Sequence, residues 1–592
     1  MIDDILSQVM KPGRYIGHEW NLPKKDFDGC AVKFALCFPD LYEVGMSNIG
    51  IRIIYGLLNK EPDVACERFF SPAQDAEAIL RNNKRLIFSL ESKKELNKFD
   101  IVGFSLGYEL QFTNVLNILE LGGVPLFSKE RSSSDPLVIA GGPAAINPEP
   151  MHEFFDLFVI GEAEEALPEL IAAYRLLKDQ LKQGKISREE LLLELSRIEG
   201  VYVPMFYGAS YGADGCLAGF EPVRKGVPGK IKKRFIADLD SAYYPVEWLV
   251  PYIQIIHDRI SVEIMRGCPN QCRFCQAHNQ YSPLRFRKKE NVLKLAESLY
   301  KNTGYEDISL AGLSVTDYPC IAELLSSLIS AFKPRGVGVS LPSIKPKDMV
   351  GGMSELIATI KKTGLTFAPE AATKRLRAIL NKDFNEDDFM AAAQGAFKAG
   401  YQHLKLYFMI GLPSERQSDL DAIFEFSNGL SMLRKNIAQR SAQINISINT
   451  LIPKPHTPFQ WLAMAPIESI IQKHEYLKKL VTRNKKIKLS VHNLEISLLE
   501  AVLSRGDRKL SRVVFTAFKM GARFDAWDNF FNFEIWKKAF SENSIDPQDY
   551  LKERPRNAVL AWDFLDIGVS KNYLLAEYDK TIALQQDSDI IN

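Results

Sequence analysis

Short apolar runs alternate with amphipathic stretches through residues 31–160. The apolar runs end in glycine or turn residues, which predicts buried strands, and they cover residues 31–38, 101–106, 136–142 and 154–161. Apolar residues at helical spacing fill the segments between them, as at 49–60 and 109–123. Apolar strands that alternate with helices predict a doubly wound parallel sheet, which is followed by the helical, charged residues 163–199.

A second alternating region begins near residue 260. Its predicted strands are residues 261–266, 307–313, 336–342, 364–370, 403–413 and 444–453. Helical patterns lie between them, for example at 389–400 and 419–433. Six strand–helix units predict a partial (β/α)6 barrel, because a full eight-unit barrel needs about 250 residues. The chain is therefore expected to belong to the α/β class.

Composition shifts divide the chain further. Residues 200–250 are rich in glycine, tyrosine and proline with short basic runs, and we interpret them as a connecting segment with some β-structure. After about residue 465 the pattern is mainly helical and charged. We therefore expect a sheet domain at 1–199, a connecting segment at 200–250, a barrel at 251–465 and a helical C-terminal region at 466–592.

The overall charge is balanced. Among the 592 residues, 74 are Lys or Arg and 73 are Asp or Glu, so the chain has no general attraction to nucleic acid or to an anionic membrane. RNA binding would need a local patch, for which the basic runs 285–289 and 483–488 are candidates, although solvated helix faces explain such runs better. Because no apolar stretch approaches eighteen residues and the N-terminus does not resemble a signal peptide, we expect a cytoplasmic protein with no membrane span.

Three of the eight cysteines stand within eight positions. Cys268, Cys272 and Cys275 follow the first predicted barrel strand, and loops at such strand ends carry the catalytic groups of αβ barrels. Three thiolates on one loop can hold three corners of a cubic iron–sulfur cluster, whose usual complement is four cysteines. The fourth iron then stays open for a substrate. Two interpretations are less favoured. One is a structural zinc site in which His278 completes the three cysteines, and the other is three buried thiols that bind no metal.

The segment "CPNQCRFC" (268–275) resembles the cluster motif of the radical S-adenosylmethionine superfamily, and Phe274 matches the aromatic residue typical of its seventh position. The resemblance implies a 4Fe-4S cluster bound by the three cysteines, whose open iron chelates S-adenosylmethionine. One-electron reduction, by a donor such as flavodoxin or ferredoxin, then yields methionine and a 5′-deoxyadenosyl radical. The resemblance does not imply a particular substrate.

Three further segments resemble S-adenosylmethionine contacts of that superfamily. "LAGLS" (310–314) corresponds to the Gly-Gly-Glu-like loop and supplies Gly312, but it lacks the acidic residue. "FAPEAATKRL" (367–376) points to Glu370, for which a carboxylate at a helix N-terminus is the structural alternative. "MIGLP" (409–413) points to Gly411, for which a plain strand-end turn is the alternative.

The N-terminal segments "FPDLYEVGMSNIG" (38–50), "FSLGYE" (104–109) and "IAGGPA" (139–144) resemble the cobalamin-binding domain. The positions that fit its motif are Asp40, Gly45, Ser105, Gly141 and Gly142. Tyr42 stands where the cobalt-ligating histidine is expected, so the resemblance implies a corrinoid held without a cobalt ligand from this loop, or a domain that has lost it. The alternative is a structural or substrate-docking sheet. Radical enzymes with such a domain often transfer methyl groups through cobalamin.

Two rival functions remain open at this point. Methylthio-transferring, RNA-modifying relatives carry three additional cysteines for a second cluster, and Cys30, Cys37 and Cys66 could supply them, although buried thiols fit their sequence context better. A non-catalytic protein with a structural iron–sulfur or zinc loop is the other rival. His456 in "PKPHTPFQW" (453–461) is expected at a pocket rim or in a rigid turn, and Asp525 is expected in a cap or ion pair.

Overall fold

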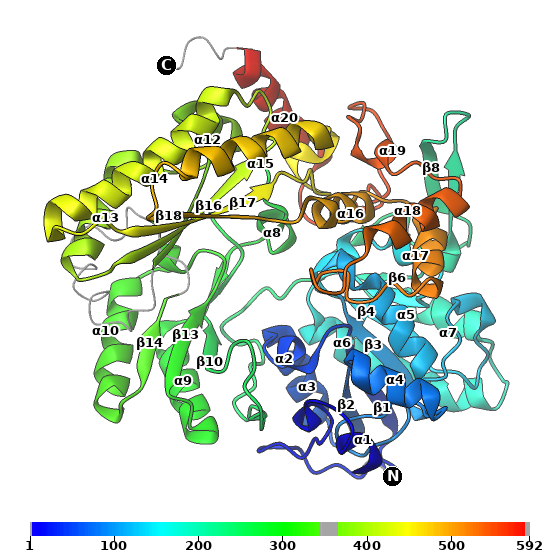
Figure 1. The fold of residues 1–592 in the computed structure, drawn as a ribbon. Coiled ribbons are helices and arrows are strands. Elements are labelled where there is room, and N and C mark those ends of the chain that lie inside the picture. Colours follow the sequence, from blue (N-terminus) through cyan, green and yellow to red (C-terminus); the bar gives the residue numbers. More distant parts are fainter. Residues whose placement is uncertain (1–2, 342–344, 346–364, 587–592) are drawn as a thin grey trace.

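The computed structural model describes residues 3–341, 345 and 365–586, and it has two lobes (Figure 1). The N-terminal lobe contains the first sheet, and the other lobe contains the barrel-like strands. The C-terminal helices cover the N-terminal lobe and then return to the barrel lobe. Residues 342 and 364, which end two of the predicted barrel strands, lie outside the described residues.

The N-terminal lobe contains the predicted doubly wound sheet. Its strands lie in the order β2 (Val64–Phe70), β1 (Val32–Phe38), β3 (Ile101–Ser105), β4 (Leu137–Gly141), β5 (Leu157–Val159) and β6 (Val201–Tyr202). All neighbouring strands are parallel except β5 and β6. Because the chain runs from β1 to β2 on one side and continues at β3 on the other, β1 and β3 form a topological switch point, where such sheets bind ligands.

Helices cover both faces of this sheet. They are α1 (Asp3–Leu6), α2 (Tyr42–Gly45), α3 (Ile49–Lys60), α4 (Gln74–Asn82), α5 (Phe112–Leu121), α6 (Ala163–Lys182) and α7 (Arg188–Leu195). The pattern at 49–60 predicted α3 with its observed bounds. Strand β2 escaped prediction because Glu67 and Arg68 interrupt its apolar run, and both are buried. The guanidinium of Arg68 pairs with the carboxylates of Glu19 and Glu91, which makes its burial tolerable.

The connecting segment contains short strands, as expected. Strands β7 (Tyr207–Tyr211) and β8 (Leu217–Pro222) form an antiparallel hairpin. Strand β9 (Ile231–Lys232) pairs in parallel with β19 (Leu565–Asp566), so this segment is tied to the C-terminal region.

The barrel lobe contains all six predicted strands. One parallel sheet comprises β10 (Ile260–Glu263), β13 (Asp307–Ala311) and β14 (Gly338–Ser340); a second comprises β15 (Leu365–Glu370), β16 (His403–Ile410), β17 (Gln443–Thr450) and β18 (Ile487–Val491). Strand β18 pairs in parallel with β17 although it lies in the region expected to be mainly helical. Its sequence, "IKLSV", has polar alternate positions and follows a basic run, which concealed the strand.

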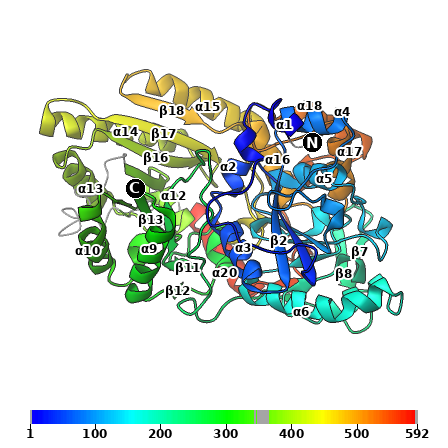
Figure 2. The ribbon, with the colours of Figure 1, turned by 90° about the horizontal axis from the view of Figure 1, so that it is seen from below.

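Helices and a short ribbon complete the barrel lobe. The helices are α8 (Gln276–Gln280), α9 (Lys289–Thr303), α10 (Ile321–Phe332), α12 (Lys374–Leu380), α13 (Glu386–Lys398), α14 (Gln417–Ala438) and α15 (Ile467–Val481). The ribbon pairs β11 (Met265–Arg266) with β12 (Arg285–Phe286). Figure 2 shows α3 of the N-terminal lobe near this ribbon, at the boundary between the lobes.

The C-terminal region is mainly helical and joins both lobes. It comprises α16 (Leu494–Ser504), α17 (Leu510–Lys519), α18 (Phe533–Glu542), α19 (Gln548–Leu551) and α20 (Lys571–Gln586). Buried residues of α16, α17 and α18 belong to the same apolar core as the N-terminal sheet. Helix α20 instead packs with α12 beside the barrel. Within the described ranges, the search for a helix long and apolar enough to cross a membrane finds none.

Candidate functional site

The three-cysteine loop leaves the ribbon strand β11 and runs from Cys268 to Cys275. Several side chains hold its backbone in place: the amide of Asn381 donates to the carbonyl of Gln271 at 2.8 Å, and a ring nitrogen of His278 lies 3.0 Å from the carbonyl of Cys268. The backbone N–H of Arg273 donates to the carbonyl of Leu380 at 3.0 Å. The loop backbone is therefore well supported by α12 and α8.

The three cysteines themselves are half-buried. Burial raises the pKa of Cys272 to about 11, against the opposing effect of the Lys382 ammonium, and the neighbouring Cys275 raises it further. Burial also raises the pKa of Cys275. Iron binding would have to remove these protons from the thiols.

No group of three His, Cys, Asp or Glu side chains converges as a site for a single metal ion in the part of the chain that is described. Cluster ligands need not converge in this way, because each cysteine of a cubic cluster binds a different iron. The donor set suits such a cluster: three thiols lie on one supported loop, close enough for Cys268 and Cys275 to affect the pKa of Cys272.

Glu370 ends strand β15 next to this loop. Its backbone has φ +66°, a left-handed conformation that is uncommon for a residue other than glycine, and it follows an irregularity in the strand register. Burial raises the pKa of its carboxyl, although the ammonium of Lys382, 3.4 Å away, opposes the shift. The carboxyl lies close enough to Cys272 to raise the pKa of that thiol, and backbone strain of this kind is often found at ligand sites.

Sequence reasoning missed a polar group on the other side of the loop. The amide of Asn270 lies 3.3 Å from the sulfur of Cys268 and 3.2 Å from a carboxylate oxygen of Asp317. The hydroxyl of Ser314 donates to the same carboxylate at 2.6 Å, and the ammonium of Lys345 pairs with it. Asp317 is an acidic residue five positions beyond Gly312, in the loop that follows β13.

Two further predicted contacts, Gly411 and Phe274, have packing neighbours in the structure. Gly411 has φ +76°, and a side chain there would meet Ile470 of α15 at 2.9 Å, so both the strand-end turn and the packing of α15 favour glycine at this position. Phe274 packs against an apolar cluster that contains Trp461 and Trp562. Its observed role is to anchor the loop to the C-terminal region.

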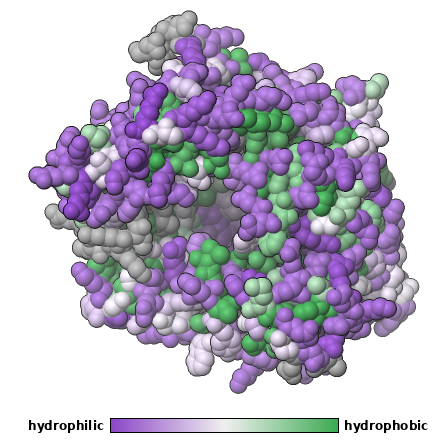
Figure 3. Space-filling model, viewed as in Figure 1, coloured by the Kyte–Doolittle hydropathy of each residue, from purple (hydrophilic) through white to green (hydrophobic). Residues whose placement is uncertain are grey.

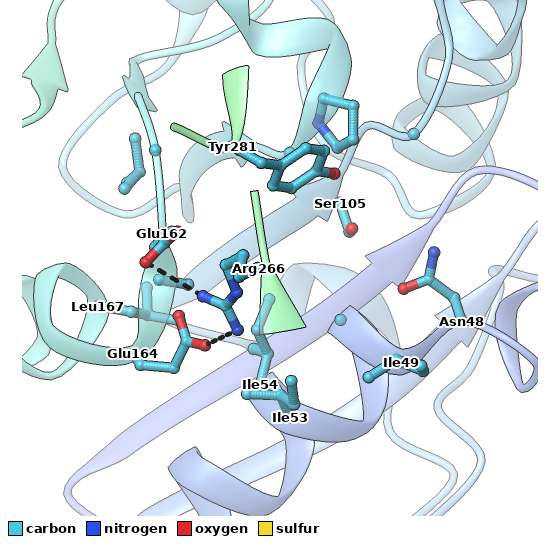
Figure 4. Close-up of a pocket in the computed structure, with 18 of the residues that line it drawn as sticks. Asn48, Ile49, Ile53, Ile54, Ser105, Glu162, Glu164, Leu167, Arg266 and Tyr281 are labelled. Atoms are coloured by element: carbon cyan, nitrogen blue, oxygen red, sulfur yellow. Dashed lines mark hydrogen bonds and ion pairs between the residues drawn. The ribbon is translucent and has the colours of Figure 1, made fainter. Parts of the chain in front are cut away.

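A cavity of about 580 Å³ lies between the two lobes (Figure 4). Ser105, Gly141 and Gly142 line it from the carboxyl ends of β3 and β4, next to the switch point of the sheet. The barrel lobe contributes Met265 and Gly312, which belong to the ribbon before the cysteines and to the end of β13. The cavity therefore extends from the cobalamin-like edge of the first lobe to Gly267, the residue directly before the cysteine loop, and Figure 3 shows a hollow between the lobes.

The other half of the cobalamin-like motif does not line this cavity. The hydroxyl of Tyr42 donates to a carboxylate oxygen of Glu19 at 2.9 Å, and the side chain is 2% exposed. The indole N–H of Trp527 donates to the carboxylate of Asp40 at 3.0 Å, which covers that residue. A side chain at Gly45 would overlap Phe70 at 2.2 Å. All three predicted positions are thus used in packing.

A buried ion-pair cluster closes one end of the cavity. The guanidinium of Arg266 contacts Glu162 at 3.1 Å and Glu164 at 2.8 Å, both from the start of α6 (Figure 4). It also contacts Glu263 of β10 at 2.9 Å. Arg285 pairs with Glu162 at 2.7 Å. The signal in the sequence was a charged residue at the end of the predicted strand 261–266, two positions before the first cysteine.

The other candidate residues from the sequence are engaged in structural contacts. A ring nitrogen of His456 lies 2.9 Å from the carbonyl of Ile146, and burial lowers the pKa of this histidine to about 4, as in a rigid turn. Asp525 accepts from Thr113 and from the indole of Trp536. In the first basic run, Arg285 is in the ion-pair cluster and Arg287 is 2% exposed, so neither is free for RNA.

The three N-terminal cysteines are buried thiols. Cys37 lies in β1 and Cys66 in the paired strand β2, at 0% and 2% exposure, and Cys30 precedes β1 at 8%. Burial raises the pKa of each thiol, most strongly for the two in the sheet. These surroundings favour the buried-thiol interpretation over a second cluster.

Known proteins resemble both lobes. A family model described as radical SAM proteins, N-terminal, matches residues 50–204, and one described as the radical SAM superfamily matches residues 262–427. An uncharacterized protein of Methanocaldococcus jannaschii is 27% identical over 483 residues, which cover 81% of this chain and 89% of that protein. The tRNA-2-methylthio-N(6)-dimethylallyladenosine synthase of Petrotoga mobilis is 23% identical over 299 residues, 47% of this chain and 65% of the synthase.

One solved structure shows a looser likeness. It is the radical S-adenosylmethionine methyltransferase TsrM of Kitasatospora setae with cobalamin and a 4Fe-4S cluster bound, at 12% identity and a TM-score of 0.48, covering 86% of this chain and 99% of that chain.

Proposed function

We propose that this chain is an enzyme of the radical S-adenosylmethionine superfamily, two of whose family models match residues 50–204 and 262–427, and that Cys268, Cys272 and Cys275 hold its 4Fe-4S cluster. When bound, the cluster supplies the electron that splits S-adenosylmethionine into methionine and a 5′-deoxyadenosyl radical. The observation that carries the assignment is a loop whose backbone is tied to α8 and α12 and whose thiols lie close enough for Cys268 and Cys275 to affect the pKa of Cys272. A one-electron donor such as flavodoxin or ferredoxin belongs to the same proposal.

Polar groups on either side of the loop bind the amino-acid end of S-adenosylmethionine in this proposal. Glu370 offers a carboxyl from a strained strand end, and Asp317 offers a second carboxylate that Ser314 and Lys345 already orient. An ammonium group pairs well with carboxylates in a partly dry site. Asp317 thus takes the place of the acidic residue that "LAGLS" lacks.

The cavity between the lobes is proposed to hold a corrinoid that takes part in methyl transfer. The supporting observations are its place at the switch point of the sheet and its lining by Ser105, Gly141 and Gly142, which leave room for a large ring. Gly312, directly after β13, lines the opposite wall of the cavity. Because Tyr42 is turned to Glu19 and buried, this corrinoid would have no cobalt ligand from the loop after β1.

The methylthiotransferase alternative rests on relatives that match less than half of this chain, such as the Petrotoga mobilis synthase. It needs a second cluster, and the burial of Cys37 and Cys66 within paired strands does not favour one. Iron content separates the two functions, because one cluster contains about four irons and two contain about eight.

The test is anaerobic reconstitution of the full chain, followed by addition of S-adenosylmethionine and dithionite and quantification of 5′-deoxyadenosine. Native protein and the control Cys320→Ala, which alters an exposed cysteine of the same lobe, should both form the product. Cys272→Ala should form none. Product from Cys272→Ala at the native rate would contradict the assignment of the cluster ligands, and bound zinc in place of iron would contradict the enzyme function.

A further inference from the structure

Arg266 connects the N-terminal lobe to the first cysteine of the loop. Its guanidinium contacts Glu162 and Glu164, which stand at the start of α6 in the N-terminal lobe. Only Gly267 separates Arg266 from Cys268. Arg266 also lines the cavity between the lobes, together with both glutamates. One side chain therefore touches the cavity, the neighbouring lobe and the root of the cysteine loop.

The backbone between Arg266 and Cys268 has little freedom to absorb a displacement. Gly267 adopts φ +91°, and a side chain there would lie 2.8 Å from the Cα of Leu284 and 2.9 Å from the carbonyl of Pro283. The ribbon pairing of β11 with β12 fixes Arg266 from the other side. A shift of α6 against the barrel lobe would therefore be passed to Cys268 rather than lost in a flexible linker.

The ion pairs are buried, which makes them sensitive to geometry. Arg266 is 9% exposed, and it bonds Glu263 of its own lobe through both Nε and Nη2, at 3.0 and 2.9 Å. It thus has one partner in the barrel lobe and two in the N-terminal lobe. Charge-assisted hydrogen bonds of this kind set direction as well as distance.

We infer that Arg266 is a positioning residue, whose ion pairs with the N-terminal lobe fix the position of Cys268. A ligand in the cavity and the cluster on the loop are therefore energetically coupled. The inference rests on the proposed cluster and on the proposed cavity ligand. Coupling between two binding sites is reciprocal, so each ligand should change the affinity for the other by the same factor.

The first test measures the cluster without any cavity ligand. Iron loss from the reconstituted full-length protein to bathophenanthroline disulfonate should be about tenfold faster in Arg266→Gln than in native protein, and intermediate in Arg266→Lys. The electron paramagnetic resonance spectrum of the reduced cluster with S-adenosylmethionine should shift in Arg266→Gln. An unchanged spectrum together with native iron loss would overturn the role of Arg266.

Arg234→Gln is the matched control. Arg234 pairs with Glu165 and Glu169 of the same helix at 3.0 and 2.6 Å, but it neither lines the cavity nor precedes a cysteine. Its iron loss should equal that of native protein. Since Arg266→Gln leaves carboxylates without their cation and can fail to fold, Glu164→Gln is the second variant. It removes one link to the N-terminal lobe while Arg266 keeps Glu162 and Glu263, and it should still accelerate iron loss.

The second test measures coupling with hydroxocobalamin as the cavity probe. In native protein its Kd should differ about tenfold between the apo and the cluster-loaded forms, and in Arg266→Gln less than twofold. Full coupling in Arg266→Gln would overturn the inference. Failure of native protein to bind hydroxocobalamin would instead overturn the corrinoid proposal together with its coupling. Native iron loss with an unchanged spectrum in Arg266→Gln would overturn the role of Arg266 and leave the proposed function intact.

Discussion

Arg273, the residue directly after the second cysteine, donates from Nε to a carboxylate oxygen of Glu577 at 2.9 Å. The two residues are 304 positions apart in the sequence. Its Nη1 donates to the carbonyls of Ala378 and Ile379 in α12. Helix α20 is therefore fastened to the middle of the cysteine loop. The C-terminal region thus contributes to the site as well as to the core.

This contact predicts a local loss of stability. We expect Glu577→Gln to lower the free energy of unfolding by about 1–3 kcal/mol, because it weakens a charge-assisted bond to a buried guanidinium. Urea unfolding of the apo protein measures the change. Lys580→Gln is the control, since Lys580 pairs with the same carboxylate from an exposed position, and it should cost less than about 1 kcal/mol. Equal losses in both variants would contradict the anchoring role.

Tyr42 provides a prediction that separates packing from ligand binding. Tyr42→Phe should lower the free energy of unfolding by about 1–3 kcal/mol, because it removes the buried hydrogen bond to Glu19. It should leave the Kd for hydroxocobalamin unchanged, whereas Ser105→Leu, which fills the cavity, should weaken binding at least tenfold. Absorbance titration measures both. A loss of affinity in Tyr42→Phe as large as in Ser105→Leu would show that Tyr42 contacts the corrinoid.

Asp525 predicts a pH dependence of stability. Burial raises its pKa from the ordinary value of 3.8 to about 6, although the hydrogen bonds from Thr113 and Trp536 oppose the shift. The folded chain therefore keeps a proton that the unfolded chain releases between about pH 4 and 6. The contribution is full below pH 4, falls as the pH rises to 6 and is constant above, a total change of about 3 kcal/mol.

Asp525→Asn isolates this effect from all other titrating groups. The difference in free energy of unfolding between native protein and the variant, measured in urea at several pH values, should change in favour of the variant between pH 4 and 6. A difference that is flat over this range would contradict the raised pKa. Asp546→Asn, an exposed carboxylate of the same region, should show no such slope.

The elements that the sequence predicted well are those with local signals. Apolar runs such as residues 32–38 and 101–105 need no partner to be identified, and the helix at 49–60 carries its own periodicity. Strand β2 was missed because Glu67 and Arg68 are buried by virtue of partners, such as Glu19 for Arg68, that are distant in sequence. Residue propensity and hydrophobic pattern do not show that a charged side chain is neutralised by a partner that only tertiary structure brings close.

The same division applies to the site. The cysteine loop is a local motif, so its three thiols could be named from the sequence. Two of the partners of Arg266, Glu162 and Glu164, lie about a hundred positions earlier, in another lobe, and only packing of the lobes brings them to Arg266. The orientation of Tyr42 likewise depends on Glu19, which precedes the first strand. A motif identifies the loop on which a residue lies, but not the direction in which its side chain points.

The two carboxyl groups beside the cysteine loop give the last prediction. If Glu370 and Asp317 bind the amino-acid end of S-adenosylmethionine, either amide substitution removes a charge-assisted contact without changing the size of the side chain. Glu370→Gln and Asp317→Asn should each weaken S-adenosylmethionine binding to the reconstituted protein about ten- to hundredfold, which corresponds to about 1.5–3 kcal/mol. The iron content should stay at about four per chain, because neither residue is proposed as a ligand.

Equilibrium dialysis under anaerobic conditions measures the Kd, and Glu386→Gln is the matched control. Glu386 is an exposed carboxylate of the same lobe, paired only loosely with Arg377 at 3.5 Å, so its substitution should leave the Kd unchanged. The two site variants also test different sides of the loop, since Glu370 lies beside Cys272 and Asp317 beside Asn270. A native Kd in Asp317→Asn together with a higher Kd in Glu370→Gln would show that Asp317 does not bind S-adenosylmethionine. Its carboxylate would then have only the structural role of holding Asn270 next to Cys268.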